Sequence, residues 1–196
     1  MGVMMAGRWK PIDAPEVSIH GVRPLRRVFH RDPRWFLIEV LRDDDRSVDG
    51  SRFRMTYSSL KVPGEFRDKD RWLAHRVQTD RFVTVLGEMM LALLDDRSNS
   101  PTRGRLEVLR LTGSPFVWVS ATVSAPAETY LVPIPPGVLH CIGNLSDAPF
   151  FLQNCPTELY DPSDEGRIPF TERPVGPADV PFSWSEVERR RGPEAA

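Results

Sequence analysis

Ten short strand-like runs follow one another along the chain, and they are the feature that most constrains its fold. Turn-forming sequences such as Pro63-Gly64 and Pro135-Pro136-Gly137 stand between them, and 19 prolines are spread through the chain. Short apolar runs separated by turn residues are typical of a β-sandwich or β-barrel. The sequence therefore predicts an all-β fold, with strands at residues 17–22, 35–42, 53–60, 72–77, 81–86, 89–94, 105–111, 130–134, 139–142 and 150–155.

The length of 196 residues suits one domain with a substantial core. We expect residues 1–15 to form a flexible N-terminal arm, because they lack periodicity and contain two prolines. Residues 16–182 are expected to form the β domain. Residues 183–196 should form a short helix and tail, because Ser185 and Glu188 have the spacing of a capping box.

Charge and composition exclude several classes of partner. The chain has 26 basic and 27 acidic side chains, so no net field recruits nucleic acid or an anionic membrane. Its longest apolar run, near residues 89–94, is far shorter than the ~20 residues of a spanning helix. Only two cysteines are present, and the N-terminus lacks the pattern of a signal peptide. We therefore expect a cytoplasmic protein.

Two segments interrupt the apolar pattern with chemically useful side chains. The first carries His75, Gln78 and Asp80, and the second carries His140. Because alternate residues of a strand face the same side, two histidines on neighbouring strands and a nearby carboxylate can converge inside a barrel. Such a set suits a Zn, Fe or Mn ion, with His75, Asp80 and His140 as ligands. The alternative is a pocket of hydrogen-bonding residues with no cofactor, which is the reading we favour.

These segments resemble the two motifs of the cupin superfamily. The second, from Pro135 to Asn144, fits Pro-x-Gly-x-x-His-x-x-x-Asn at every position. The first departs in having Asp80 for the usual Glu, Leu73 for the first His and Arg67 for the leading Gly. The resemblance implies a double-stranded β-helix, the cupin jelly roll. The lost His at Leu73 weakens the metal interpretation.

A closer resemblance, over residues 17–184, is to the dTDP-4-dehydrorhamnose 3,5-epimerase family. Four signatures occur in the family's order, at residues 19–22, 32–39, 95–104 and 160–166. The resemblance implies a homodimer in which strands near residues 35–42 pair across the interface. It also implies an isomerase of carbohydrate or secondary-metabolite biosynthesis, which binds a dTDP-linked 4-keto-6-deoxy sugar and epimerises carbons beside the ketone.

The departures from this family fall on its catalytic residues. The base His aligns with Leu73, whose side chain cannot move protons, and the acid Tyr aligns with Asn154, whose amide is no general acid. The Asp that partners the base aligns with Glu172, so a carboxylate is kept there. The resemblance therefore implies a divergent member of the family.

Three interpretations follow. In the favoured one, His75 is the base, Glu172 orients it, and His140 or Arg71 stabilises the enolate oxygen. In the second, the His75, Asp80 and His140 set holds one divalent metal ion and acts on a different small molecule. In the third, the cupin binds a ligand without turnover.

The remaining candidates are predicted to contact the ligand. In the resembling family's nucleotide segment, an Arg would pair with diphosphate oxygens and a ring would stack on the base. Two polar residues beside the first motif are further diphosphate candidates, and two more residues occupy pocket positions of the family. The set comprises Arg34, Phe36, Glu39, Trp72, Gln78, Arg81 and Asn154.

Overall fold

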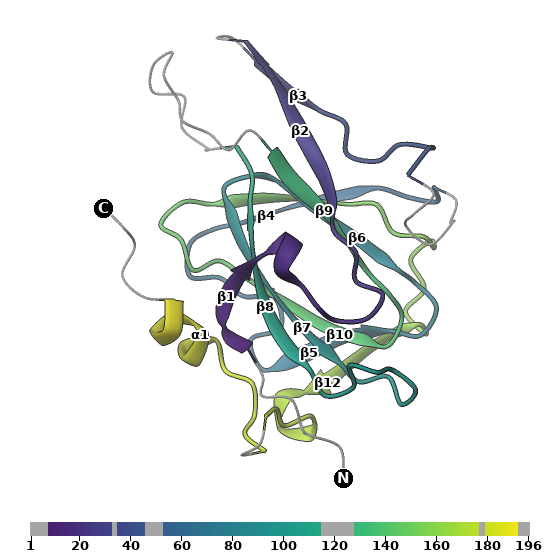
Figure 1. Cartoon of the computed structure of the whole chain (residues 1–196), viewed down its shortest axis with the longest axis vertical. Coiled ribbons are helices and arrows are strands. Elements are labelled where there is room, and N and C mark those ends of the chain that lie inside the picture. Colours follow the sequence, from purple (N-terminus) through teal and green to yellow (C-terminus); the bar gives the residue numbers. More distant parts are fainter. Residues whose placement is uncertain (1–7, 33–34, 46–52, 115–127, 177–178, 192–196) are drawn as a thin grey trace.

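The computed structural model describes residues 8–32, 35–45, 53–114, 128–176 and 179–191 of the chain. Within them, two six-stranded sheets pack face to face, and a single α-helix lies near the C-terminus (Figure 1). The predicted all-β jelly roll with a short C-terminal helix is therefore confirmed. No helix in the described part of the chain has the length and apolar character needed to span a membrane.

The first sheet has the strand order β1-β8-β7-β10-β5-β12, and the second has the order β3-β2-β9-β6-β11-β4. Neighbouring strands are antiparallel except for β1 and β8, which are parallel. The strands of the first sheet are β1 (Arg8–Asp13), β8 (Leu106–Thr112), β7 (Glu88–Asp95), β10 (Val138–Gly143), β5 (Arg71–His75) and β12 (Glu165–Pro169). Those of the second are β3 (Trp35–Ile38), β2 (Leu25–Asp32), β9 (Glu128–Ile134), β6 (Asp80–Leu86), β11 (Phe150–Asn154) and β4 (Tyr57–Lys61).

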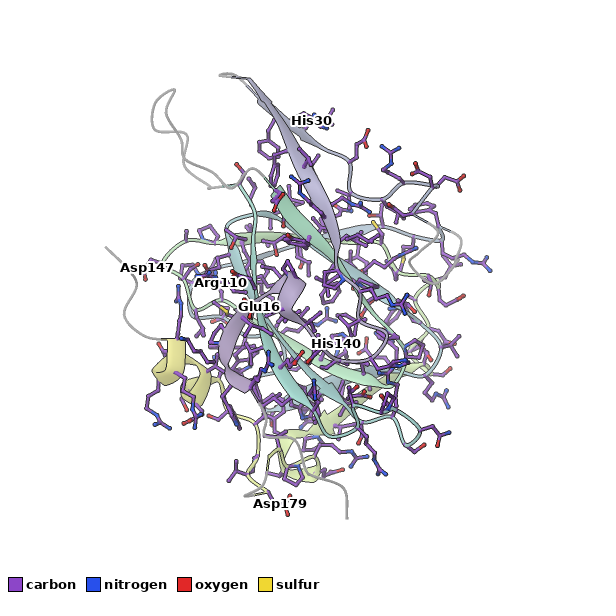
Figure 2. The ribbon with its side chains drawn as sticks, in the orientation of Figure 1. Glu16, His30, Arg110, His140, Asp147 and Asp179 are labelled. Atoms are coloured by element: carbon purple, nitrogen blue, oxygen red, sulfur yellow. The ribbon has the colours of Figure 1, made fainter. Side chains whose placement is uncertain are left out.

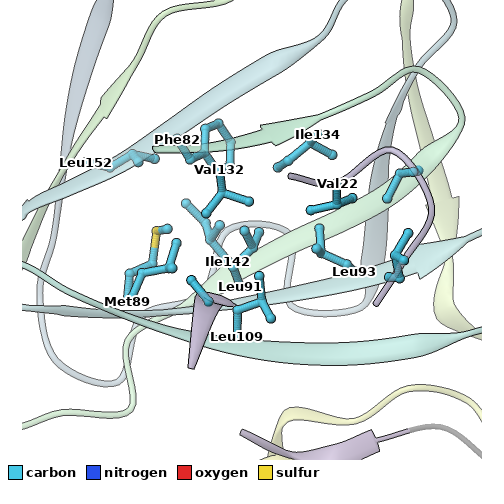
Figure 3. Close-up of a cluster of buried hydrophobic side chains, with 14 of the residues drawn as sticks. Val22, Phe82, Met89, Leu91, Leu93, Leu109, Val132, Ile134, Ile142 and Leu152 are labelled. Atoms are coloured by element: carbon cyan, nitrogen blue, oxygen red, sulfur yellow. The ribbon is translucent and has the colours of Figure 1, made fainter. Parts of the chain in front are cut away.

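The interior between the sheets is filled by side chains that alternate along the strands. On β7, Met89, Leu91 and Leu93 point into this interior, where Figure 3 shows Leu91 and Leu93 among side chains of both sheets. The intervening residues Met90 and Ala92 belong to a second cluster on the other face of the sheet. Burial on both faces explains why β7 is a continuous apolar run rather than an alternating one.

The second cluster is an aromatic layer that covers the outer face of the first sheet. Phe182 stacks on Trp9 at 5.4 Å between ring centroids, and it also contacts Trp72 and Trp184. The layer joins β1, the 3₁₀ helix η2 (Phe170–Glu172) and the helix α1 (Trp184–Arg191) to the sheet. It leaves the inner face of β5 free to carry polar side chains.

Three boundary predictions need correction. Residues 8–13 are not a loose arm, because they form β1 and pair with β8, and the short 3₁₀ helix η1 (Ala14–Glu16) follows; residues 1–7 lie outside the described residues. Residues 17–22 form no strand. The C-terminal helix is confirmed, but it begins at Trp184, with the carbonyl of Ser183 accepting the first N–H, rather than at a Ser185 cap.

Candidate functional site

Four strand ends meet at one mouth of the barrel. β5 ends at His75, β6 begins at Asp80, β11 ends at Asn154 and β4 begins at Tyr57. The register places Asn154 opposite Tyr57 on one side and Phe82 on the other. Polar side chains from both sheets therefore gather where the apolar interior stops.

His75, Asp80 and His140 are brought together at this mouth. Oδ2 of Asp80 lies 3.4 Å from Nε2 of His75 and 3.2 Å from Nε2 of His140. The two imidazole rings are 5.9 Å apart at their centroids and tilted by 29°. Figure 2 places His140 in the middle of the molecule, whereas His30 lies on the projecting β2–β3 hairpin. Asp80 and His140 are buried, and only His75 retains some exposure.

Nδ1 of His75 faces a carboxylate that the sequence analysis missed. Oδ2 of Asp164 lies 3.3 Å from this nitrogen. The Asp164 carboxylate also accepts hydrogen bonds from the backbone N–H groups of Arg76, Val77 and Gln78, at 2.9–3.1 Å. These three amides fix the carboxylate in place, so Asp164 is positioned to orient the imidazole. Its only sequence signal was its place within the signature at residues 160–166.

The second oxygen of Asp80 is held by two amides. Nε2 of Gln78 and Nδ2 of Asn154 each donate to Oδ1 of Asp80 at 2.8 Å. The side-chain oxygen of Asn154, Oδ1, accepts a hydrogen bond from the backbone N–H of Arg81 at 2.9 Å. Oδ1 of Asp80 is therefore satisfied, whereas its Oδ2 faces the two imidazole rings with no aligned hydrogen bond.

The charges of this cluster shift its pKa values in opposite directions. Burial would raise the pKa of Asp80, but its contacts with His140 and His75 outweigh burial and hold that pKa well below the ordinary range. Burial would lower the pKa of His75, but contact with Asp80 and the fields of Asp164 and Glu165 outweigh it and raise that pKa. An anionic Asp80 beside a readily protonated His75 is the resting arrangement.

A hollow of about 510 Å³ lies next to the mouth, and His75 itself is not among the residues that line it. Asp164 lines it, together with Arg54, Arg76 and Tyr160. A second cavity, beside His140, has a volume of only about 10 Å³, which is room for roughly one water molecule. A sugar-sized ligand therefore fits on the His75 side of the cluster and not in the depth of the barrel.

The structure corrects the role predicted for Glu172. In the β5–β12 register, Glu165 pairs with His75 and Pro169 pairs with Arg71. Glu172 lies beyond the end of β12 in η2 and is exposed. The prediction that Glu172 orients His75 is therefore wrong, and Asp164 occupies that place.

Arg71 is also too far from His75 for the predicted partnership. Both side chains face the same side of β5, but four residues separate them, or about 13 Å along an extended strand. Arg71 instead lines the small cavity beside His140 and pairs with Asp70 at 3.4 Å. It cannot stabilise an enolate that forms next to His75.

Two predicted ligand contacts are buried structural residues. Trp72 is fully buried in the outer aromatic layer, 5.0 Å from Phe170 between ring centroids, so the prediction of a pocket residue is wrong. Arg81 is 2% exposed, and its guanidinium donates to the carbonyls of Cys155 and Pro156. It is not available to a diphosphate.

The predicted nucleotide segment lies away from this cluster. Arg34 falls outside the described residues. Phe36 packs edge-on against Phe29 of the neighbouring strand, with 5.4 Å between ring centroids. Glu39 is an exposed partner of Arg42. Within one chain, none of the described members of this segment is shown to contact the His75 cluster.

Comparisons with known proteins point to carbohydrate biosynthesis. Agl13 of Haloferax volcanii, a probable low-salt glycan biosynthesis epimerase, is 31% identical over 157 residues, which cover 78% of this chain and 89% of Agl13. The spore coat polysaccharide biosynthesis protein SpsL of Bacillus subtilis is 27% identical over 169 residues, covering 85% of this chain and 97% of SpsL. A dTDP sugar isomerase structure from Desulfovibrio desulfuricans has a TM-score of 0.65 at 24% identity, covering 85% of this chain and 92% of that one. No family model matches the chain.

A double-stranded β-helix with histidine and carboxylate side chains at its mouth defines a cupin. The similarity to Agl13, which extends over most of both chains, identifies the family within the cupins. The chain belongs to the dTDP-4-dehydrorhamnose 3,5-epimerase family, whose members are sugar isomerases.

Proposed function

We propose that the protein is an isomerase that epimerises a nucleotide-linked 4-keto-6-deoxy sugar in carbohydrate biosynthesis. The observation that carries this proposal is the placement of His75. Its ring lies between the Asp164 and Asp80 carboxylates, and Asp164 lines a hollow large enough for a sugar. The biosynthetic epimerase relative described above supports the same reaction class.

The geometry assigns a role to each side chain at the mouth. Asp164 faces Nδ1 of His75, whereas Nε2 lies 3.4 Å from Asp80 and 3.3 Å from Nε2 of Gln78. As the proposed base, the neutral imidazole takes a proton from the carbon next to the ketone. The electron pair of the broken C–H bond then moves onto the ketone oxygen as an enolate. His140 is buried beside the small cavity and does not line the hollow, so its part in this reaction is to hold Asp80 next to His75.

Solvent exchange tests the proposal. We expect the protein to incorporate deuterium from D₂O beside the ketone of dTDP-4-keto-6-deoxyglucose, as measured by NMR. Because a base must be neutral and the pKa of His75 is raised, the rate should increase with pH through a midpoint above ~6.5, the ordinary His value. Binding of the nucleotide sugar without exchange at any pH would contradict the proposal and favour a ligand-binding cupin.

A metal-dependent activity is a second candidate, and the orientation of the donors favours it. Nε2 of His75, Nε2 of His140 and Oδ2 of Asp80 converge. Nε2 of His140 and Oδ2 of Asp80 have no hydrogen-bond partner among the described residues, whereas Nε2 of His75 lies 3.3 Å from Nε2 of Gln78. The separations of 3.2 and 3.4 Å from Oδ2 match those of ligands about 2.1 Å from a common ion. Asp164 and the Val138 carbonyl face the two Nδ1 atoms, which is the usual support for metal-binding imidazoles. A bound divalent ion would supply Lewis-acid stabilisation of an oxyanion.

Elemental analysis checks the metal candidate. If it is right, the purified protein should contain one Zn, Fe or Mn ion per chain, and His140→Ala should lose it. His30→Ala is the matched control, because His30 is exposed on β2. Chelation should then lower the thermal unfolding temperature of the wild type. A metal content that is equal in both variants would contradict this site, and the cofactor-free epimerase would stand.

Other parts of the proposal concern partners and location. The dTDP group follows from the family. A homodimer is supported by the β2–β3 hairpin, which projects from the edge of the second sheet and exposes 42% of Val28 and 48% of Leu37 (Figure 1). Apolar side chains on an exposed hairpin are suited to a partner surface. The cytoplasmic location stays an expectation.

A further inference from the structure

The hydroxyl of Tyr57 lies directly beside the position where the family carries its acid. Asn154 occupies that position on β11, and Tyr57 is its cross-strand partner on β4. Nδ2 of Asn154 lies 2.8 Å from the Tyr57 hydroxyl oxygen. The same nitrogen donates to Asp80, so no more than two hydrogen-bond lengths separate the phenol from the His75, Asp80 and His140 cluster.

The hydrogen-bond pattern fixes the direction of the contact between Asn154 and Tyr57. The amide oxygen of Asn154 accepts the backbone N–H of Arg81, so its amide nitrogen must face Asp80. An amide nitrogen carries two hydrogens and accepts none. One hydrogen serves Asp80, and the other is donated to the Tyr57 oxygen. The phenol is thus an acceptor from Asn154, and its own proton is directed to a different acceptor.

Burial and charge keep this phenol protonated. Tyr57 is half-buried, and burial together with the nearby Asp80 charge raises its pKa above the ordinary value, against the opposing effects of Asn154 and Arg67. At neutral pH the group is therefore a neutral proton donor. Arg67 also lines the small cavity beside His140, so it connects the phenol with the interior side of the cluster.

We propose that Tyr57 is the catalytic acid of the epimerisation, supplied from the strand next to the one that carries the acid elsewhere in the family. The inference rests on the proposed function. His75 removes the proton from one face of the carbon, and the O–H bond of Tyr57 breaks to deliver a proton to the opposite face of the enolate. The products are the inverted carbon, a Tyr57 phenolate and a His75 imidazolium. Proton exchange with solvent returns both side chains to their starting states. Asn154 acts as a positioning residue that keeps the phenol proton directed at the substrate.

The test compares inversion with exchange in the same reaction. In D₂O, Tyr57→Phe should still exchange the hydrogen beside the ketone at a rate within a few-fold of wild type, because His75 is intact. Its rate of inversion, measured by NMR of the product sugar, should fall by about 10²-fold or more. Tyr130→Phe removes a phenol from β9 that is hydrogen-bonded only to Glu128 among the described contacts, and it should leave both rates unchanged.

The outcomes distinguish a failure of the proposed function from a failure of the role of Tyr57 alone. An inert wild type overturns both. A wild type that exchanges and inverts, with Tyr57→Phe inverting equally fast, overturns only the role of Tyr57. Tyr57→His is the second variant, because it keeps a proton donor and should restore part of the inversion. Its failure to exceed Tyr57→Phe, with both variants melting near the wild-type temperature, would contradict an acid role.

Discussion

His75→Gln should reduce the rate of deuterium exchange beside the ketone by about 10²–10⁴-fold, the usual contribution of a positioned general base. Glutamine keeps an amide near Asp80 and Asp164 but cannot accept the proton. Exchange measured by NMR in D₂O reports removal of the proton by His75 and return of a deuteron to the same face, so it does not require inversion. The large effect is expected because His75 is the one member of the cluster that retains some exposure, and its Nδ1 lies 3.3 Å from the Asp164 carboxylate.

His30→Gln is the matched control for this variant. Because His30 is exposed on β2, this variant should catalyse deuterium exchange at the wild-type rate. A His75→Gln protein that folds and still exchanges within a few-fold of wild type would remove His75 as the base. A variant that loses exchange together with a bound metal ion would point instead to the metal-dependent candidate.

The sequence predicted the parts of the site that depend on strand alternation. His75 and His140 were expected to converge because residues two apart on a strand share a face, and the structure brings them to one carboxylate. The same rule also places Trp72 on the face opposite to Leu73 and His75. Alignment with the family, rather than the strand pattern, suggested a pocket role for Trp72.

The parts that were missed depend on contacts between distant segments. Asp164 is in a turn 89 residues from His75, and its role comes from three backbone amides that only the folded chain presents. Glu172 looked suitable because one-dimensional alignment cannot show the β5–β12 register, which carries Glu172 beyond Arg71, at the end of β5 opposite to His75. The partnership of Tyr57 with Asn154 likewise required the β4–β11 pairing.

The strands that the sequence did not predict were missed for a different reason. β1 and β12 are sheet edges that contain proline, and β2 is rich in charged residues. Proline at an edge costs no ladder hydrogen bond in the sheet interior, and exposed strands need no apolar alternation. Such strands lack the local pattern by which the central strands β6 and β7 were found.

Asp80→Ala should destabilise the protein by about 3–5 kcal/mol near pH 5.5, the usual effect of removing one partner from a buried charged cluster. The substitution leaves the Gln78 and Asn154 amides without their shared acceptor. It also removes the charge that raises the pKa of His75. Urea unfolding measures the loss, and Asp147→Ala is the control, because Asp147 is exposed (Figure 2) and should change stability by no more than about 0.5 kcal/mol.

The pH dependence of that loss distinguishes charge from packing. The folded-state pKa of Asp80 is depressed, so this carboxylate contributes to the free energy of unfolding above its unfolded-state pKa of about 4. That contribution disappears as the pH falls through the folded-state pKa. The folded-state pKa of His75 is raised, so its contribution is complete below about 6.5 and is lost as pH rises through the folded value. The stability that Asp80→Ala loses, measured as free energy of unfolding, should therefore be largest between about pH 4 and 6.5 and smaller near pH 9. A deficit that is equal at both pH values would mean that the cavity left by the side chain, rather than the attraction between Asp80 and His75, accounts for the lost stability.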